Sequence, residues 1–291
     1  AVHAHTLFNG GLIASVAKSA GVPVRVCHAH STSDARNASL LGRLYHTAMR
    51  RLILRNATRL VACGEQAGRY LFGDVAYDEG RVSLLQNGLD LAAFERLSRQ
   101  DAVSRYRREF GFGPQDVVLG HVAGFRPVKN HGFLVELMER IAGSDRRYRL
   151  LLVGDGATRP QIEELVDQRG LRDTVTFAGL RTDIPELMTF FDVFVLPSQY
   201  EGLPVTVIEA QAAGTPCVLS DVITREVDLG LGLVRWAHLN DVATWERAIT
   251  AALPRPDIPW SVRDAVLCAA GYSARESVSR LYPLYGAAAD D

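Results

Sequence analysis

The sequence predicts an α/β protein with parallel, doubly wound sheets. From Asp116 onward, short apolar runs typical of strands alternate with segments whose apolar residues recur at helical spacing. Strands that alternate with helices favour a parallel sheet, which binds ligands at the carboxyl ends of its strands. Polar, glycine-containing segments follow several of these strands. The chain of 291 residues is long enough for two domains.

The second domain is expected at residues 91–270. We expect its strands at 117–123, 150–153, 175–177, 193–196, 217–220 and 233–236, and its helices at 132–141, 159–169, 185–190, 204–213 and 241–253.

The first domain is expected at residues 1–90, because the turn signal Asn87-Gly88 follows an apolar run there. Strand-like runs lie at 22–27, 59–63 and 81–85, and a segment of helical period lies at 40–54. Residues 1–5 are typical of the end of a buried strand rather than of a natural start. We therefore expect the chain to be N-terminally incomplete.

Composition narrows the class of protein. The chain is 47% hydrophobic and 22% charged, as in ordinary soluble domains, and its net charge of -1 argues against a nucleic-acid binder. No segment approaches the roughly 18 apolar residues of a membrane span. Four widely spaced cysteines without a CxxC pair are typical of buried, reduced residues and predict a cytoplasmic protein. They are Cys27, Cys63, Cys217 and Cys268.

Residues 198–204 and the helix expected after them form the first candidate site. Gly202 permits a tight turn, and Pro204 suits the first helical position. The backbone N–H groups at that helix end predict a phosphate site. Glu201 and Glu209 would be unfavourable beside phosphate unless they bind hydroxyls, which sugars and ribose supply. The alternative is that Glu201 caps the helix and Glu209 lies on its surface.

Two cations form the second candidate. Lys129 and Arg126 follow the expected strand at 117–123, at its carboxyl end. There they could neutralise a pyrophosphate leaving group. A solvated surface lysine is the alternative interpretation.

Two His-x-His steps form a third candidate: His3 with His5, and His28 with His30. Residues two apart on a strand share a face, so a metal site and a metal-dependent hydrolase are conceivable. Packing of these histidines at a domain cleft is the alternative, and we predict no metal.

A basic stretch runs from Arg36 to Arg69, with apolar residues around Leu40, Leu44 and Leu52. Such a segment could lie on an anionic membrane surface. A solvated helix face is the alternative. The arginines of the stretch are Arg36, Arg43, Arg50, Arg51, Arg55, Arg59 and Arg69.

Taken together, these segments resemble the family 4 glycosyltransferases of the GT-B fold, particularly bacterial exopolysaccharide and capsule enzymes. The resemblance runs along essentially the whole chain. Its most specific part is the family's Glu-x7-Glu motif, which matches residues 201–216 and is followed by Ser220-Asp221. Residues 86–90, 152–156, 177–179 and 195–198 also match in family order, and residues 28–31 match the histidine segment of the acceptor domain.

The resemblance implies two Rossmann-like domains facing a cleft, the first of them truncated, and a last helix within 271–291 that returns to the first domain. By it, Glu209 would hold the ribose hydroxyls. Glu201, with the backbone of Gly202 and Leu203, would hold the donor sugar.

Lys129 would contact the diphosphate, and His28 or His30 would face the transferred sugar. The family usually has Gly-Arg-Phe where this chain has Ala123-Gly124-Phe125, so Arg126 would have to replace the phosphate-binding arginine. The other donor-binding residues would be Gly154, Arg181, Ser198 and Pro204.

The implied enzyme is a retaining, metal-independent glycosyltransferase of the hexosyltransferase type, without a cofactor. It would transfer a sugar from a nucleotide-sugar donor to a saccharide or polyprenyl-diphosphate-linked acceptor, in the cytoplasm or at the inner membrane face. A sugar-nucleotide epimerase on the same fold, a metal-dependent hydrolase and a non-catalytic nucleotide-binding fragment are alternatives.

Overall fold

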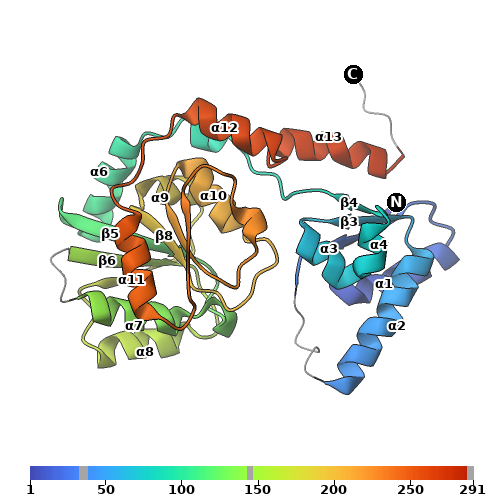
Figure 1. Cartoon of the computed structure of the whole chain (residues 1–291), viewed down its shortest axis with the longest axis horizontal. Helices are drawn as coiled ribbons and strands as arrows, with labels where there is room; N and C mark the ends of the chain where they lie inside the picture. Colours follow the sequence, from blue (N-terminus) through green and yellow to red (C-terminus); the bar gives the residue numbers. More distant parts are fainter. Residues whose placement is uncertain (33–38, 143–146, 287–291) are drawn as a thin grey trace. The chain divides into compact units, whose positions relative to one another are not determined.

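The computed structural model describes residues 1–32, 39–142 and 147–286, and the chain forms two compact units (Figure 1). The first unit contains Ala1–Asp90, Tyr200–Leu203 and the C-terminal residues from Cys268 onward; the second contains Leu91–Gln199 and Pro204–Leu267. Each unit has one parallel sheet with helices packed on it, which confirms the predicted α/β class.

The sheet of the first unit has four parallel strands in the order β1-β2-β3-β4. These strands are β1 (Val2–Ala4), β2 (Arg25–Ala29), β3 (Arg59–Ala62) and β4 (Val82–Leu84). The helices of this unit are η1 (Leu7–Asn9), α1 (Gly10–Ser19), α2 (Leu40–Asn56), α3 (Glu65–Phe72), α4 (Asp74–Asp78) and α13 (Ala274–Leu284).

Helices α1 and α2 pack closely because Gly11 has no side chain. A Cβ atom at Gly11 would lie 2.6 Å from the Met49 carbonyl oxygen. Helix α2 starts where the Ser39 hydroxyl accepts a hydrogen bond from the Gly42 amide, as an N-cap does. Helix α1, rich in glycine and small residues, is one that the sequence did not predict.

Helix α13 belongs to the core of the first unit although it lies at the end of the chain. The Leu89 amide donates to the Tyr272 carbonyl, and the Ala274 amide donates to the Leu89 carbonyl. A Cβ at Gly88 would lie 2.6 Å from the Cα of Ala274, so the turn at Asn87-Gly88 needs glycine for this approach. Residues Leu281, Leu284 and Tyr285 pack against Val26, Val61 and Leu85.

The second unit has a six-stranded parallel sheet in the order β10-β9-β8-β5-β6-β7. Its strands are β5 (Asp116–Val122), β6 (Arg147–Val153), β7 (Val175–Gly179), β8 (Val193–Leu196), β9 (Cys217–Ser220) and β10 (Val234–Ala237). Its helices are α5 (Ala92–Glu95), α6 (Arg99–Phe110), η3 (Pro127–Lys129), α7 (His131–Ile141), α8 (Arg159–Gln168), α9 (Ile184–Phe190), α10 (Val205–Ala213), η4 (Arg225–Val227), α11 (Val242–Ala251) and, ending at the junction, α12 (Trp260–Ala269).

The central strands of this sheet are apolar on both faces because helices cover both. Leu150, Leu152, Val193 and Val195 are fully buried, and Trp245 of α11 is buried in the same core. Continuous apolar runs are typical of such strands. The predicted strands of this unit all occur, whereas α6 and α12 were not predicted.

Two details differ from the sequence predictions. Helix α10 begins at Val205, so Pro204 precedes the helix instead of opening it. Cys268 is only half-buried, while the other three cysteines are buried. Arg36 lies outside the described residues. Among the residues that the structure describes, no helix is both long and apolar enough to cross a membrane.

Candidate functional site

The candidate donor site lies in the second unit, where the strand order reverses. Strand β5 pairs with β6 on one side and with β8 on the other, so the chain winds outward from β5 in both directions. Open α/β sheets bind ligands at the carboxyl ends of the strands at such a reversal. The loops after β5 and β8 meet there, since the Gln199 amide donates to the Val128 carbonyl at 2.9 Å.

The loop after β5 presents the two predicted cations. Arg126 is exposed and Lys129 is half-buried at the end of η3. Phe125 anchors this loop: it is fully buried, its amide donates to the Asp155 carbonyl at 2.9 Å, and its ring stacks on His131 at 4.0 Å. The anchored ring holds the loop in place beneath the exposed Arg126.

Gly124 occupies the position where the resembling family has arginine. A Cβ at Gly124 would meet the Asp155 carbonyl oxygen at an ordinary 3.5 Å, so a side chain fits there. The Nε atom of Arg126 lies 4.0 Å from that same Cβ position. The guanidinium of Arg126 therefore extends beside the place from which the family arginine would project.

Glycines bring the loop after β6 against the loop after β5. Gly154 has a φ of +136°, its amide donates to the Gly179 carbonyl at 2.8 Å, and a Cβ there would overlap the Ala123 carbonyl oxygen. Gly156 has a φ of +155°, and its Cβ would lie 2.5 Å from the Phe125 carbonyl oxygen. The structure thus shows a close backbone approach at Gly154, and Gly156 shares it although the sequence analysis gave Gly156 no role.

Helix α10 brings an N-terminus and a carboxylate to the same edge. In the part of the chain that the structure describes, no side chain caps its N-terminus, where Pro204 lies. Glu209 is half-buried in its middle, and burial raises the pKa of the Glu209 carboxyl. Ser198 is fully buried before the helix, and its carbonyl accepts from the Ser220 hydroxyl at 2.6 Å.

Arg181, predicted to line the nucleotide crevice, is held by two carboxylates. Its guanidinium lies 2.7 Å from Asp183 and 2.6 Å from Glu109. The Arg181 hydrogen bond lowers the pKa of Asp183 to about 2. A ligand at Arg181 would have to share the guanidinium with these partners.

Residues Tyr200–Leu203 belong to the first unit, next to His30. The Thr32 hydroxyl donates to the Glu201 carbonyl at 2.5 Å, and a Cβ at Gly202 would lie 2.5 Å from the His30 carbonyl oxygen. Leu203 is buried and Glu201 half-buried. The structure thus brings together Glu201, Gly202 and His30, which the sequence analysis proposed separately.

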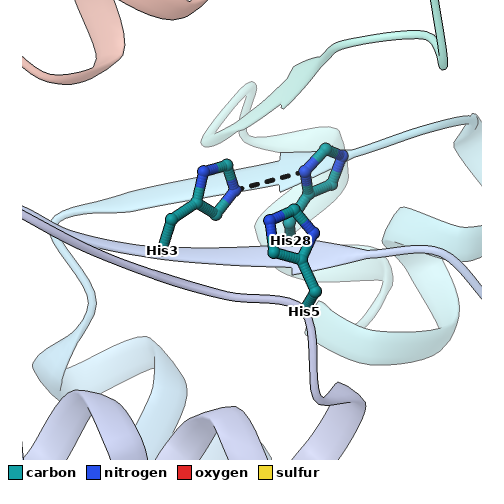
Figure 2. A group of neighbouring side chains, drawn as sticks. All are labelled: His3, His5 and His28. Atoms are coloured by element: carbon teal, nitrogen blue, oxygen red, sulfur yellow. Dashed lines mark hydrogen bonds between the residues drawn. The ribbon is translucent and has the colours of Figure 1, made fainter.

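Four histidines gather at the carboxyl ends of β1 and β2 in the first unit. The register pairs Ala4 with Cys27, so His3 and His5 share a face of the sheet with His28 and His30. The Nε2 atom of His3 lies 3.2 Å from Nδ1 of His28. Figure 2 marks this contact with a dashed line. Nδ1 of His5 lies 2.8 Å from Nε2 of His30.

Burial and mutual repulsion favour the neutral forms of His3, His28 and His30. Burial, followed by the positive charges of His5 and His30, lowers the pKa of His3 to about 4. Burial and then His30, His3 and His5 lower the pKa of His28 to about 3, and burial and His5 lower the pKa of His30. Tyr285 of the C-terminal segment contacts the group, with its hydroxyl 2.6 Å from Nδ1 of His3. The sequence analysis missed Tyr285 because nothing in its local pattern links it to a distant strand.

The predicted basic stretch divides into two parts. Arg69 forms ion pairs with Glu65 at 2.7 Å and with Asp78 at 2.8 Å, so its charge is compensated. On α2, by contrast, Arg43, Arg51 and Arg55 are exposed. The exposed apolar residues of this helix are Leu40, Leu41 and Leu44.

Comparisons with known proteins match most of the chain. The family "Glycosyl transferases group 1" matches residues 103–227, and the family "Glycosyl transferase 4-like domain" matches residues 1–88. A putative glycosyltransferase, EpsF of Bacillus subtilis (strain 168), is 45% identical over 288 residues, which are 98% of this chain and 74% of that protein. The UDP-Gal:alpha-D-GlcNAc-diphosphoundecaprenol alpha-1,3-galactosyltransferase of Escherichia coli is 26% identical over 76% of this chain and 57% of its own length.

Solved structures share the fold. Anabaena Alr3699/HepE in complex with UDP and glucose has a TM-score of 0.78 at 19% identity, over 98% of this chain and 77% of that chain. WaaG, a glycosyltransferase involved in lipopolysaccharide biosynthesis, has a TM-score of 0.66 at 20% identity, over 94% of this chain and 79% of its own. These similarities confirm the predicted GT-B fold.

Proposed function

The chain belongs to the group 1 glycosyltransferases, and from that membership we propose that it transfers a sugar from a nucleotide-sugar donor to a saccharide hydroxyl, with retention at the anomeric carbon. The acceptor in this proposal is linked to a polyprenyl diphosphate and serves cell-surface polysaccharide biosynthesis. Two relatives support the donor and the acceptor of this proposal: the Escherichia coli enzyme is named for UDP-Gal and a diphosphoundecaprenol-linked sugar, and HepE is solved with UDP and glucose.

One observation supports nucleotide-sugar binding: two cations and a helix N-terminus follow neighbouring strands at the point where the strand order reverses. Lys129 and Arg126 follow β5, and α10 follows β8, with the two loops joined by the Gln199–Val128 hydrogen bond. Backbone amides at a helix N-terminus favour a phosphate, and cations beside them stabilise a departing diphosphate. This arrangement supports a transfer step that needs no metal ion.

Carboxylates bind the hydroxyls of the donor in this proposal. Glu209 holds the ribose hydroxyls from within α10, while Glu201 and the Gly202 backbone hold the donor sugar. His28 or His30 meets the transferred sugar. During transfer the bond from the anomeric carbon to the diphosphate breaks, the acceptor oxygen forms the new glycosidic bond on the same face, and the hydroxyl proton leaves with the diphosphate.

The first test is donor binding without metal. The chain, in EDTA, is melted with UDP, GDP, ADP and their sugar conjugates. A ligand at 100 times its Kd stabilises the folded state by about 2.7 kcal/mol. We expect one nucleotide to raise the Tm and Glu209→Gln to remove the shift, while Glu136→Gln, an exposed glutamate of α7, keeps it. A wild-type chain that melts cooperatively and shifts with no nucleotide contradicts the donor site.

The second test asks whether Arg126 replaces the family arginine. Losing one donor to a developing oxyanion costs about 100-fold in rate. We expect Arg126→Ala to lower kcat by roughly this factor and the added change Gly124→Arg to restore most of it, because a side chain fits at Gly124. Arg140→Ala, on the exposed face of α7, is the control. An unchanged kcat in Arg126→Ala rules out the replacement. Product analysis in the same assay separates transfer from epimerisation.

We further propose that α2 holds the enzyme at the cytoplasmic face of the inner membrane. The exposed Leu40, Leu41 and Leu44 lie on the same helix as the exposed arginines, a combination that favours anionic lipid surfaces. Leu41→Asp should release the protein from vesicles that contain anionic lipid. Val75→Asp on α4, equally exposed, should not; equal binding of both variants contradicts the proposal.

A further inference from the structure

The histidine cluster has a geometry that the proposed transfer reaction does not require. Each of His3, His5 and His28 offers a ring nitrogen, and these three nitrogens all lie within 4.8 Å of one another (Figure 2). A reaction that needs one histidine against a sugar does not explain why three converge. Their ring centroids are 4.2 Å apart for His3 and His5, 5.2 Å for His3 and His28, and 5.0 Å for His5 and His28.

The spacing fits one small cation. Zinc binds imidazole nitrogen at about 2.0–2.1 Å, so two nitrogens on a tetrahedral ion are about 3.3 Å apart. His3 and His28 already place Nε2 and Nδ1 at 3.2 Å. His5 is exposed, so its ring can rotate to close the wider distances. Three protein ligands then leave one coordination position open, as at many zinc sites.

The surroundings of the cluster also match a metal site. Ligand histidines usually hydrogen-bond a second group through their other ring nitrogen, which orients the ring. Nδ1 of His3 contacts the Tyr285 hydroxyl at 2.6 Å, while Nε2 of His3 faces His28. His28 is buried, so its ring is held in place by its surroundings. His5 is exposed, so an ion can reach the cluster from solvent.

We propose that His3, His5 and His28 bind one divalent transition-metal ion of the kind that imidazole favours, with Zn²⁺ as the representative. Tyr285 orients His3 from behind, and the fourth coordination position is open. His30, whose Nε2 lies 2.8 Å from Nδ1 of His5, borders that position.

The site has a consequence that rests on the proposed function. If His28, rather than His30, is the histidine that meets the transferred sugar, an ion on His28 withdraws it, so Zn²⁺ inhibits transfer that proceeds in EDTA. The metal is thus a regulator of the enzyme and not a participant in the reaction.

Metal binding is tested without donor or acceptor. The full chain, prepared without a histidine tag and stripped with EDTA, is dialysed against Zn²⁺ and analysed for bound metal. Co²⁺ is used as a visible-light probe, because a tetrahedral cobalt site absorbs strongly. We expect one ion per chain and intense cobalt bands. His5→Gln, an exposed position, should weaken binding at least about tenfold, the lower end of the loss seen when even an outer-shell partner is removed.

Two further variants sharpen the test. His238→Gln changes an exposed histidine of the second unit and should bind metal like the wild type. Tyr285→Phe should weaken binding about 10–100-fold without removing a ligand. A wild-type chain that takes up no metal, or a His5→Gln variant that binds as tightly as the wild type, overturns the proposal. No nucleotide is present in the metal-binding experiment, so its failure does not affect the separate test of nucleotide binding.

Discussion

The carboxyl ends of the two sheets are built in different ways. In the second unit this edge is shaped by backbone: Gly154 and Gly156 let one loop lie against another, and the Gln199 amide joins the loops after β5 and β8. In the first unit the corresponding edge is shaped by side chains, the imidazoles of His3, His5 and His28. Backbone amides at the edge of the second unit's sheet can donate hydrogen bonds to an anion. Imidazole nitrogens at the edge of the first unit's sheet can accept a hydrogen bond from a hydroxyl or coordinate a cation.

This difference predicts which substitutions damage the fold and which change only the chemistry. In the second unit, a side chain added at one of these glycines must displace backbone atoms. In the first unit, replacing an imidazole such as that of His5, which is exposed, leaves the strands in place. Fluorescence separates the two, because all three tryptophans, Trp236, Trp245 and Trp260, lie in the second unit.

The largest effect is expected at Gly154. Gly154→Ala puts a methyl group onto the Ala123 carbonyl at a φ of +136°, so we expect the second unit to lose at least about 3 kcal/mol of unfolding free energy. Urea unfolding followed by tryptophan fluorescence measures the loss. The matched control is Gly132→Ala in α7, where nothing lies within 4 Å and the change should stay within about 1 kcal/mol. If Gly154→Ala and Gly132→Ala lower the unfolding free energy equally, close backbone contact does not determine the structure of this edge.

An intermediate effect is expected from acid. Burial, and then the charge of Lys129, lowers the pKa of His131 to about 4, whereas the unfolded value is about 6.5. Between pH 6.5 and pH 4, His131 is therefore protonated in the unfolded chain but not in the folded chain. The unfolding free energy falls as the pH drops through this range. Each such histidine contributes about 1.4 kcal/mol per pH unit in this window.

The variant His131→Phe tests this slope. Its ring can keep the stacking on Phe125 but cannot titrate, so the fall in unfolding free energy between pH 6.5 and pH 5 should be shallower than in the wild type. His121, with a pKa lowered to about 3 mainly by burial, keeps part of the slope. A wild-type slope in His131→Phe would show that His131 already titrates normally when folded.

The smallest effect is expected at Tyr285 in metal-free protein. Tyr285→Phe removes one hydrogen bond to His3, which costs about 0.5–1.5 kcal/mol in the first unit. Hydrogen exchange of peptides from β1 and β2 should speed up accordingly, with the tryptophan signal of the second unit unchanged. Tyr282→Phe, on an exposed part of α13, is the control. A change in the tryptophan transition instead would place the effect outside the first unit.

The sequence predicted the sheets better than it predicted the sites. Strands such as β8 and β9 are short, continuous apolar runs, which are typical of strands that are buried on both faces, as these are. Helix α6 was missed because its strongly polar face hides the two buried residues, Ala102 and Tyr106.

At the sites, local motifs identified residues but not their neighbours. The contacts of Thr32 with Glu201, and of Tyr285 with His3, join positions far apart in the chain, so no local pattern carries them. One of the two ion pairs of Arg181 likewise depends on Glu109 of the unpredicted helix α6. Gly156 could have been found from the Gly154-Asp155-Gly156 sequence, where two glycines in one short loop indicate two close approaches.

The packing of α13 onto the first sheet sets an order of events during synthesis. The second unit is contained within residues 91–267, so all of its strands are synthesised before α13. The first unit cannot complete its core until Leu281, Leu284 and Tyr285 emerge, long after β1 to β4. The core of the first unit therefore depends on residues that are synthesised after every strand of both sheets.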